Sequence, residues 1–143
     1  MCWVVYIASD QPLPLIGWDD ARPAFNVRAL DAEALSRVRH HFSLPHVVEA
    51  GSHEGCACGF NCGVLQAADD RERAEEDARL RSLESLAEYV EQAASEGRLE
   101  LYACWIGDEE LAEQGRALVS TQCFRRQPFE LEERKLLTLA RRI

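Results

Sequence analysis

Four side chains that could bind a metal or carry thiol chemistry lie together in one glycine-rich segment, residues 51–63, here called the cysteine loop. They follow the pattern His-x2-Cys-x-Cys-x3-Cys, formed by His53, Cys56, Cys58 and Cys62. Three of the six cysteines therefore fall within seven residues. Glycines remove side-chain bulk and allow positive φ angles, so a short backbone can curl around a small centre. This composition is typical of a tight metal-binding loop.

Zinc is the first metal that these donors predict. Zinc takes four nitrogen or sulfur ligands in a tetrahedron, and three thiolates with one imidazole form an attested structural set. The predicted ligands are His53, Cys56, Cys58 and Cys62. The Cys-x-Cys spacing differs from the usual zinc pattern of two Cys-x2-Cys pairs. Copper(I) also suits thiolate-rich sites, and an iron–sulfur cluster would need a further cysteine, Cys2, Cys104 or Cys123, to approach the loop.

Two other hypotheses explain the cysteine loop without a metal. In the first, His53 or backbone N–H groups make one thiol reactive, and two nearby cysteines alternate between dithiol and disulfide in a redox protein or sensor. The candidate pairs are Cys58 with Cys62 and Cys56 with Cys62. In the second, small residues only turn the chain sharply, and the protein is an interaction module that uses its sheet and the loop around Trp18.

The remaining cysteines and two of the histidines receive structural interpretations. Cys2 and Cys104 fall on predicted strands, where a cysteine is usually an inert core residue, and Cys123 is interpreted in the same way. His40 and His41 fall in the last turn of a predicted helix, where positive charge complements the helix dipole. The sequence holds no phosphate-binding glycine loop, Gly-x-Ser-x-Gly or His-Glu-x-x-His motif, and leaves open whether the protein is an enzyme.

A strand and a helix are expected to position the cysteine loop. Residues 46–50 predict a short strand that leads into it. After it, Asp69 begins the strongest predicted helix, with Glu72 in capping-box position and Gly97 at the C-terminal end. Apolar residues at helical spacing form one stripe along this helix: Leu80, Leu83, Ala87, Val90 and Ala94.

Three further strands and one further helix are predicted around these two. A strand rich in Trp, Val, Tyr and Ile at residues 2–8 should lie centrally in a sheet. Residues 25–30 and 99–106 also predict strands, and Asp31 caps a helix that ends near Ser43.

The tail is ambiguous, because residues 130–139 fit a helix by propensity and a strand by pattern. We favour a strand that pairs near residues 117–120. The chain as a whole predicts one domain, residues 1–143, of the α+β class. The expected architecture is a two-layer sandwich with a mainly antiparallel sheet and two principal helices on one face, and a ferredoxin-like arrangement is the specific candidate.

The charge pattern limits the partners. Eleven acidic and five basic residues lie between positions 64 and 100, so this stretch carries −6 of the net charge of −9. Such a field repels phosphate backbones and anionic lipid, so neither nucleic acid nor a membrane is expected as a partner, whereas a metal ion or another protein is. The apolar run at residues 3–8 is too short for a membrane span, and we expect a cytoplasmic protein whose cysteines are reduced.

Overall fold

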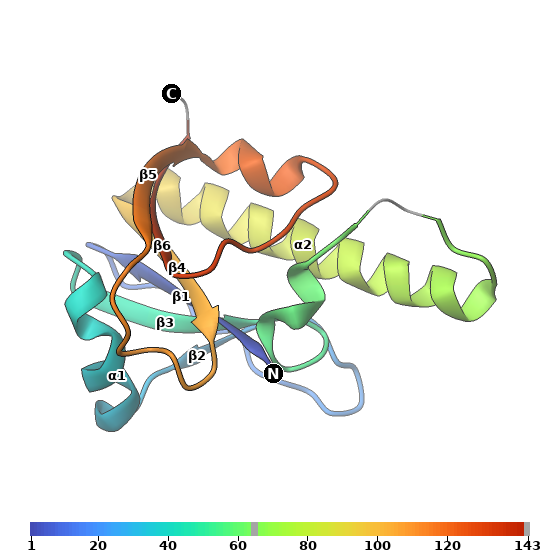
Figure 1. Cartoon of the computed structure of the whole chain (residues 1–143), viewed down its shortest axis with the longest axis horizontal. Coiled ribbons are helices and arrows are strands. Elements are labelled where there is room, and N and C mark those ends of the chain that lie inside the picture. Colours follow the sequence, from blue (N-terminus) through green and yellow to red (C-terminus); the bar gives the residue numbers. More distant parts are fainter. Residues whose placement is uncertain (64–65, 142–143) are drawn as a thin grey trace.

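The computed structural model describes residues 1–63 and 66–141, and these residues form an α+β fold (Figure 1), as the sequence predicts. The elements in chain order are β1 (Trp3–Ser9), β2 (Asn26–Ala29), α1 (Ala32–Val38), the 3-10 turn η1 (Arg39–His41), β3 (His46–Gly51), the 3-10 turn η2 (Ala57–Phe60), α2 (Asp70–Glu96), β4 (Leu99–Trp105), β5 (Gly115–Ser120), the 3-10 turn η3 (Thr121–Arg125) and β6 (Lys135–Ala140).

The strands in the described part of the chain form one six-stranded sheet in the order β2-β3-β1-β4-β6-β5. The sheet is mainly antiparallel, as expected, and only β5 and β6 run parallel to each other. Strand β1 lies in the interior of the sheet, because it pairs with β3 along one edge and with β4 along the other. This position confirms the prediction from its apolar composition. The strand order does not confirm the ferredoxin-like arrangement.

The two α-helices lie against opposite faces of the sheet, which corrects the expectation that they share one face. Successive side chains of a strand point to opposite faces. On β1, Val5 and Ile7 pack in the core cluster that contains α2, whereas Val4 and Tyr6 pack in the cluster that contains Val38 of α1. The uninterrupted apolar run of β1 thus has to be covered on both sides.

Helix caps appear where the sequence predicts them. Asp69 accepts a hydrogen bond from the backbone N–H of Glu72 (2.8 Å), and Asp31 caps α1 in the same way. Gly97 ends α2, but with an extended backbone (φ −173°) in place of the usual left-handed one. A Cβ atom at Gly97 would overlap the Asp10 carboxylate, which accepts the backbone N–H of Arg98, so a larger residue here would have to displace that side chain.

The tail forms strand β6, which confirms the favoured interpretation of that segment. Residues 115–120 pair with it in parallel register, with Ala117 opposite Leu137. A parallel ladder of six residue pairs provides backbone hydrogen-bond partners for a segment whose helix propensity competes with its apolar pattern. None of the helices in the described residues combines the length and apolar character that a membrane span requires.

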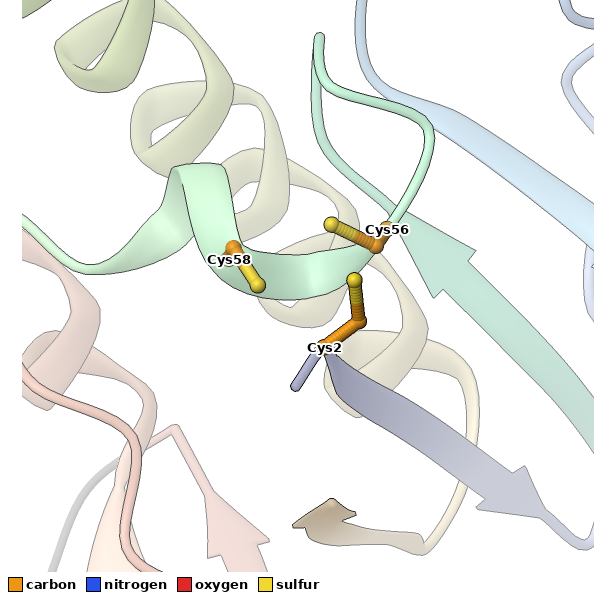
Figure 2. A group of neighbouring side chains, drawn as sticks. All are labelled: Cys2, Cys56 and Cys58. Atoms are coloured by element: carbon orange, nitrogen blue, oxygen red, sulfur yellow. The ribbon is translucent and has the colours of Figure 1, made fainter. Parts of the chain in front are cut away.

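The cysteine loop connects β3 to the approach of α2 and lies beside the first residues of the chain (Figure 2). Its centre is the short turn η2, which contacts α2, β1 and β3. The loop is therefore enclosed by the helix on one side and by the sheet on the other.

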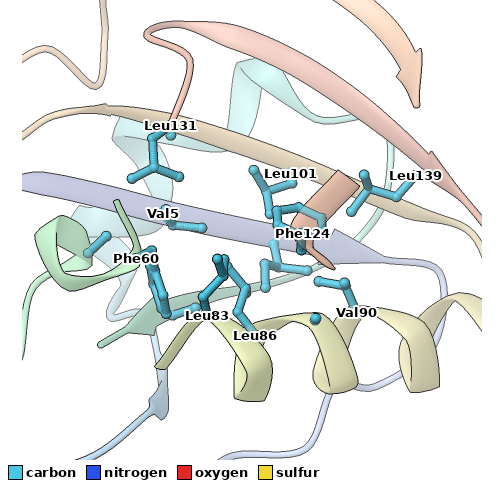
Figure 3. Packing of buried hydrophobic residues seen from close by; sticks show 14 of the residues in the cluster. Val5, Phe60, Leu83, Leu86, Val90, Leu101, Phe124, Leu131 and Leu139 are labelled. Carbon is cyan, nitrogen blue, oxygen red and sulfur yellow. The ribbon is translucent and has the colours of Figure 1, made fainter. Parts of the chain in front are cut away.

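The larger hydrophobic core lies between α2 and the sheet (Figure 3). From α2 it receives Leu83, Leu86, Ala87, Val90 and Ala93, all less than 9 % exposed. The predicted stripe is thus largely correct, although Leu80 and Ala94 pack only at its margin. Phe60 of η2 is completely buried in the same core, so the cysteine loop is anchored by a large apolar side chain.

Candidate metal centre

Three cysteines come together at the start of β1. The Sγ atoms of Cys2, Cys56 and Cys58 all lie within 4.8 Å of one another (Figure 2). Two thiolates on a tetrahedral zinc ion lie about 3.8 Å apart, because the zinc–sulfur bond is roughly 2.3 Å. The three side chains would therefore have to move inward to place all three sulfurs on a single ion.

The sheet positions Cys2 for this contact. The backbone N–H of Ile106 donates to the carbonyl of Cys2 (2.8 Å), which extends the β1–β4 pairing by one residue beyond Trp3. Next to it, the backbone N–H of Trp3 donates to Cys58 Sγ (3.3 Å), across 55 residues of sequence. The start of β1 is therefore in direct contact with the sulfur of Cys58.

Ser52 holds the cysteine loop closed from inside. Its fully buried hydroxyl donates to the carbonyl of Cys56 (2.6 Å) and accepts the N–H groups of Glu54 and Gly59 (3.2 Å each). The backbone N–H of Ser52 also donates to the carbonyl of Cys56 (2.9 Å). One side chain thus connects both ends of the turn that contains Cys56 and Cys58.

Two glycines of the loop are needed for specific reasons. Gly55 has a φ of 85°, in the left-handed region that side chains disfavour. Gly59 packs so closely on Ser52 and His53 that a Cβ atom there would overlap both side chains. These two positions confirm the prediction that the glycines let the backbone curl tightly.

Arg79 connects the loop to α2. Its guanidinium donates to the carbonyls of Cys58 (3.3 Å) and Asn61 (3.0 Å), which closes the last turn of η2. It also pairs with Glu75 (3.2 Å), the helical pair that i,i+4 spacing predicts, and with Glu54 of the loop (3.8 Å). Sequence reasoning missed the role of Arg79 in the loop, because the carbonyls it binds are distant in sequence.

The structure brings together two of the four predicted ligands. Cys56 and Cys58 belong to the thiol cluster, whereas His53 and Cys62 have other contacts. His53 Nδ1 lies 2.8 Å from Ser82 Oγ on α2. Cys62 is 1 % exposed in the core and its backbone exchanges two hydrogen bonds with Phe129. Whether His53 and Cys62 bind a metal stays a prediction.

Cys2 requires a correction, because its expected place was the core. Strand β1 begins at Trp3, so Cys2 lies just beyond the buried run and its side chain is exposed beside the loop. Cys104 is completely buried, as expected, and Cys123 is partly buried. A position at the end of a strand was the only sequence signal that could have separated Cys2 from Cys104.

Burial dominates the electrostatics of the loop. It raises the pKa of the Cys56 thiol to about 12, and the adjacent Cys58 side chain also raises it, although the backbone N–H of Cys58 acts in the opposite direction. Burial likewise raises the pKa of Cys62 and lowers that of His53, so the His53 ring is neutral at neutral pH. Without a cation the thiols of Cys56 and Cys62 are protonated at neutral pH. A metal ion bound to a cysteine would stabilise its thiolate form.

His41 is a second residue whose role differs from the expectation of a charge at a helix end. Its ring is 1 % exposed and stacks on Tyr102, with the ring centroids 4.0 Å apart. Nε2–H donates to the carbonyl of Glu109 (2.7 Å), and Nδ1 lies 3.1 Å from the Glu113 carboxylate. His41 therefore fastens the connection between β4 and β5 to the face of the sheet that α1 covers.

Comparison with known proteins gave no match among family models, curated proteins or solved structures. The chemistry of this site accordingly rests on its own residues.

Proposed function

We propose that the protein binds one thiophilic metal ion, zinc in the first instance, through the thiolates of Cys2, Cys56 and Cys58. The observation that carries the proposal is the approach of three sulfur atoms to within 4.8 Å of one another, from two segments far apart in sequence. The Trp3 N–H that donates to Cys58 Sγ (3.3 Å) supports it, because this contact fixes the start of β1 beside the sulfur.

Three thiolates leave one position of a zinc tetrahedron for a further ligand. Because the side chain of Cys2 is exposed, water can reach this side of the site. Copper(I) is the main alternative metal, since it also prefers soft sulfur ligands. An iron–sulfur cluster is disfavoured, because it usually takes four cysteines and this group holds three.

The role that follows is structural or regulatory. A metal ion on these cysteines would connect the first residue before β1 to the loop before α2, an arrangement that only the folded chain provides, and so would stabilise the folded state. An ion that binds only the folded chain adds RT ln(1 + [L]/Kd), or about 2.7 kcal/mol at a concentration one hundred times Kd. Metal binding would thereby couple the order of the cysteine loop to metal supply.

The test is the metal content of tag-free protein purified without added metal or chelator, measured by elemental mass spectrometry. We expect about one zinc per chain, and we expect Cys2→Ser, Cys56→Ser and Cys58→Ser each to lose it. Cys123→Ser is the matched control, because Cys123 is a partly buried cysteine outside the cluster, and it should retain the metal.

Two more variants examine the other predicted ligands. Under the three-thiolate proposal, His53→Ala and Cys62→Ala keep the metal, whereas loss in either would restore the four-ligand prediction. Protein free of zinc, copper and iron would refute the metal proposal. If the same sample then showed rapid alkylation of loop thiols or a disulfide that mild oxidation forms, the thiol-redox hypothesis would replace it.

A further inference from the structure

A cavity lies between α2 and the segment before β2, on the side of the cysteine loop where His53 is located. Its volume is about 440 Å³, within the range of roughly 300–1,000 Å³ that small-molecule sites occupy. It is lined by Pro23, Ala24, Phe25, His53, Ala78, Arg81, Ser82 and Ser85. The lining therefore combines an apolar wall from one segment with polar groups from the loop and from α2.

Arg81 supplies the positive charge of this cavity. The i,i+4 spacing predicts an ion pair with Asp77, but the pair is not formed, and no carboxylate of the described residues lies within 4.0 Å of the Arg81 guanidinium. On the same helix Arg73 and Arg79 have acidic partners, whereas the exposed Arg71, like Arg81, has none within 4.0 Å among the described residues. Because Arg81 also lines the cavity, its charge is available to a ligand there.

His53 supplies a polar ring to this cavity. Ser82 is 2 % exposed, and its Oγ accepts the backbone N–H of His53 (3.0 Å). The ring atom Nδ1 of His53 lies 2.8 Å from the same Ser82 Oγ. Ser82 thereby holds the His53 ring in the cavity wall.

We propose that this cavity binds a small monocarboxylate with an apolar or aromatic body, its carboxylate held by Arg81 and His53 and its body against Phe25. Guanidinium groups match carboxylates in geometry and charge, and an imidazole N–H adds a second, directional contact. Phe25, together with Pro23 and Ala24, offers the apolar surface.

The charge around the cavity favours a single negative charge on the ligand. An adjoining cavity shares Ala24, Phe25 and Ser85 with it and carries Glu88 in its wall. One unpaired guanidinium balances one carboxylate, whereas a dianion such as phosphate would be repelled by the acidic helix. This inference does not depend on the metal proposal, because none of the three clustered cysteines lines the cavity.

The test is a titration of the ¹⁵N-labelled protein with benzoate, followed by NMR. We expect saturable shifts at the amides of His53, Phe25 and Ser85, and binding of the neutral analogue benzyl alcohol at least about tenfold weaker, since a charge-assisted contact is lost. Arg81→Gln should weaken benzoate binding by a similar factor. Arg71→Gln is the matched control, an exposed arginine of the same helix outside the cavity lining, and should bind like the unaltered protein.

Two outcomes would overturn the proposal. One is the absence of saturable shifts in the cavity residues at millimolar benzoate. The other is equal affinity for benzoate and benzyl alcohol, which would show that Arg81 does not recognise the carboxylate. The comparison of these two compounds uses only the unaltered protein, so it decides the matter even if Arg81→Gln changes the fold. Phosphate binding in place of benzoate would also contradict the monocarboxylate assignment.

Discussion

Replacing Ser52 by alanine should destabilise the protein and loosen the thiol cluster together. The variant removes one fully buried hydroxyl, which donates to the carbonyl of Cys56 and accepts the N–H groups of Glu54 and Gly59. The rest of the side chain is retained, so the change is confined to these three hydrogen bonds.

The expected size follows from what each partner does afterwards. The Cys56 carbonyl still accepts the backbone N–H of Ser52 in the variant. Losing its second hydrogen bond, from the hydroxyl, therefore costs about 0.5–1.5 kcal/mol, as for an ordinary hydrogen bond. Glu54 is exposed and its N–H can turn to water, but Gly59 is buried, and an orphaned buried N–H costs about 1–3 kcal/mol. The sum is about 2–4 kcal/mol, or roughly 5–15 °C in Tm for a domain of this size.

Urea unfolding followed by tryptophan fluorescence would measure this difference in the presence of a chelator, with an unchanged m-value as the sign of an unchanged fold. Ser36→Ala is the control, because its hydroxyl donates to a helix carbonyl at an exposed position and its loss should change stability by less than about 0.5 kcal/mol. A Ser52→Ala variant as stable as this control would refute the role of Ser52 as the internal link of the loop. If the Ser52→Ala variant bound the metal with unchanged affinity, the hydrogen bonds of Ser52 would not be needed to position the cysteine cluster.

Three further predictions concern single residues. Gly59→Ala should lower the free energy of unfolding by about 1–3 kcal/mol, because the added Cβ overpacks the loop. Gly63→Ala should lower it much less, because a Cβ there meets open space. Thermal unfolding of the two variants makes the comparison. Glu91 has its pKa lowered by a hydrogen bond from Arg125, so its contribution to stability is present above the ordinary carboxyl pKa of 4.5 and is lost as pH falls through the lowered value. Glu91→Gln should therefore reduce stability in urea at neutral pH, and the difference should shrink as pH falls below 4.5; a loss that stays equal at every acidic pH would contradict the linkage. His41→Ala should lower the free energy of unfolding by about 2–4 kcal/mol, since it removes a buried ring whose two nitrogens both have hydrogen-bond partners. Hydrogen exchange should accelerate first in the connection between β4 and β5. Exchange that accelerates uniformly would argue that His41 does not fasten that connection.

The elements themselves were largely predictable because their signals are local. Asp31 and Asp69 cap their helices through contacts within four residues, and the apolar run of β1 identifies a strand buried in the interior of the sheet. Which face each helix covers was not predictable in this way, since Val38 and Leu86 are equally suitable for either side of an apolar strand. The long-range packing of two separate clusters decides it.

The candidate site divides in the same manner. The sequence by itself determined that a glycine-rich loop would bring Cys56 and Cys58 close together, because two residues of separation and a tight turn suffice for that. Only the tertiary structure decided that Cys2 joins them and that Ser82 engages His53. Those approaches depend on the β1–β4 register and on the position of α2, which are properties of the whole packed chain and have no signature in the spacing of the loop residues.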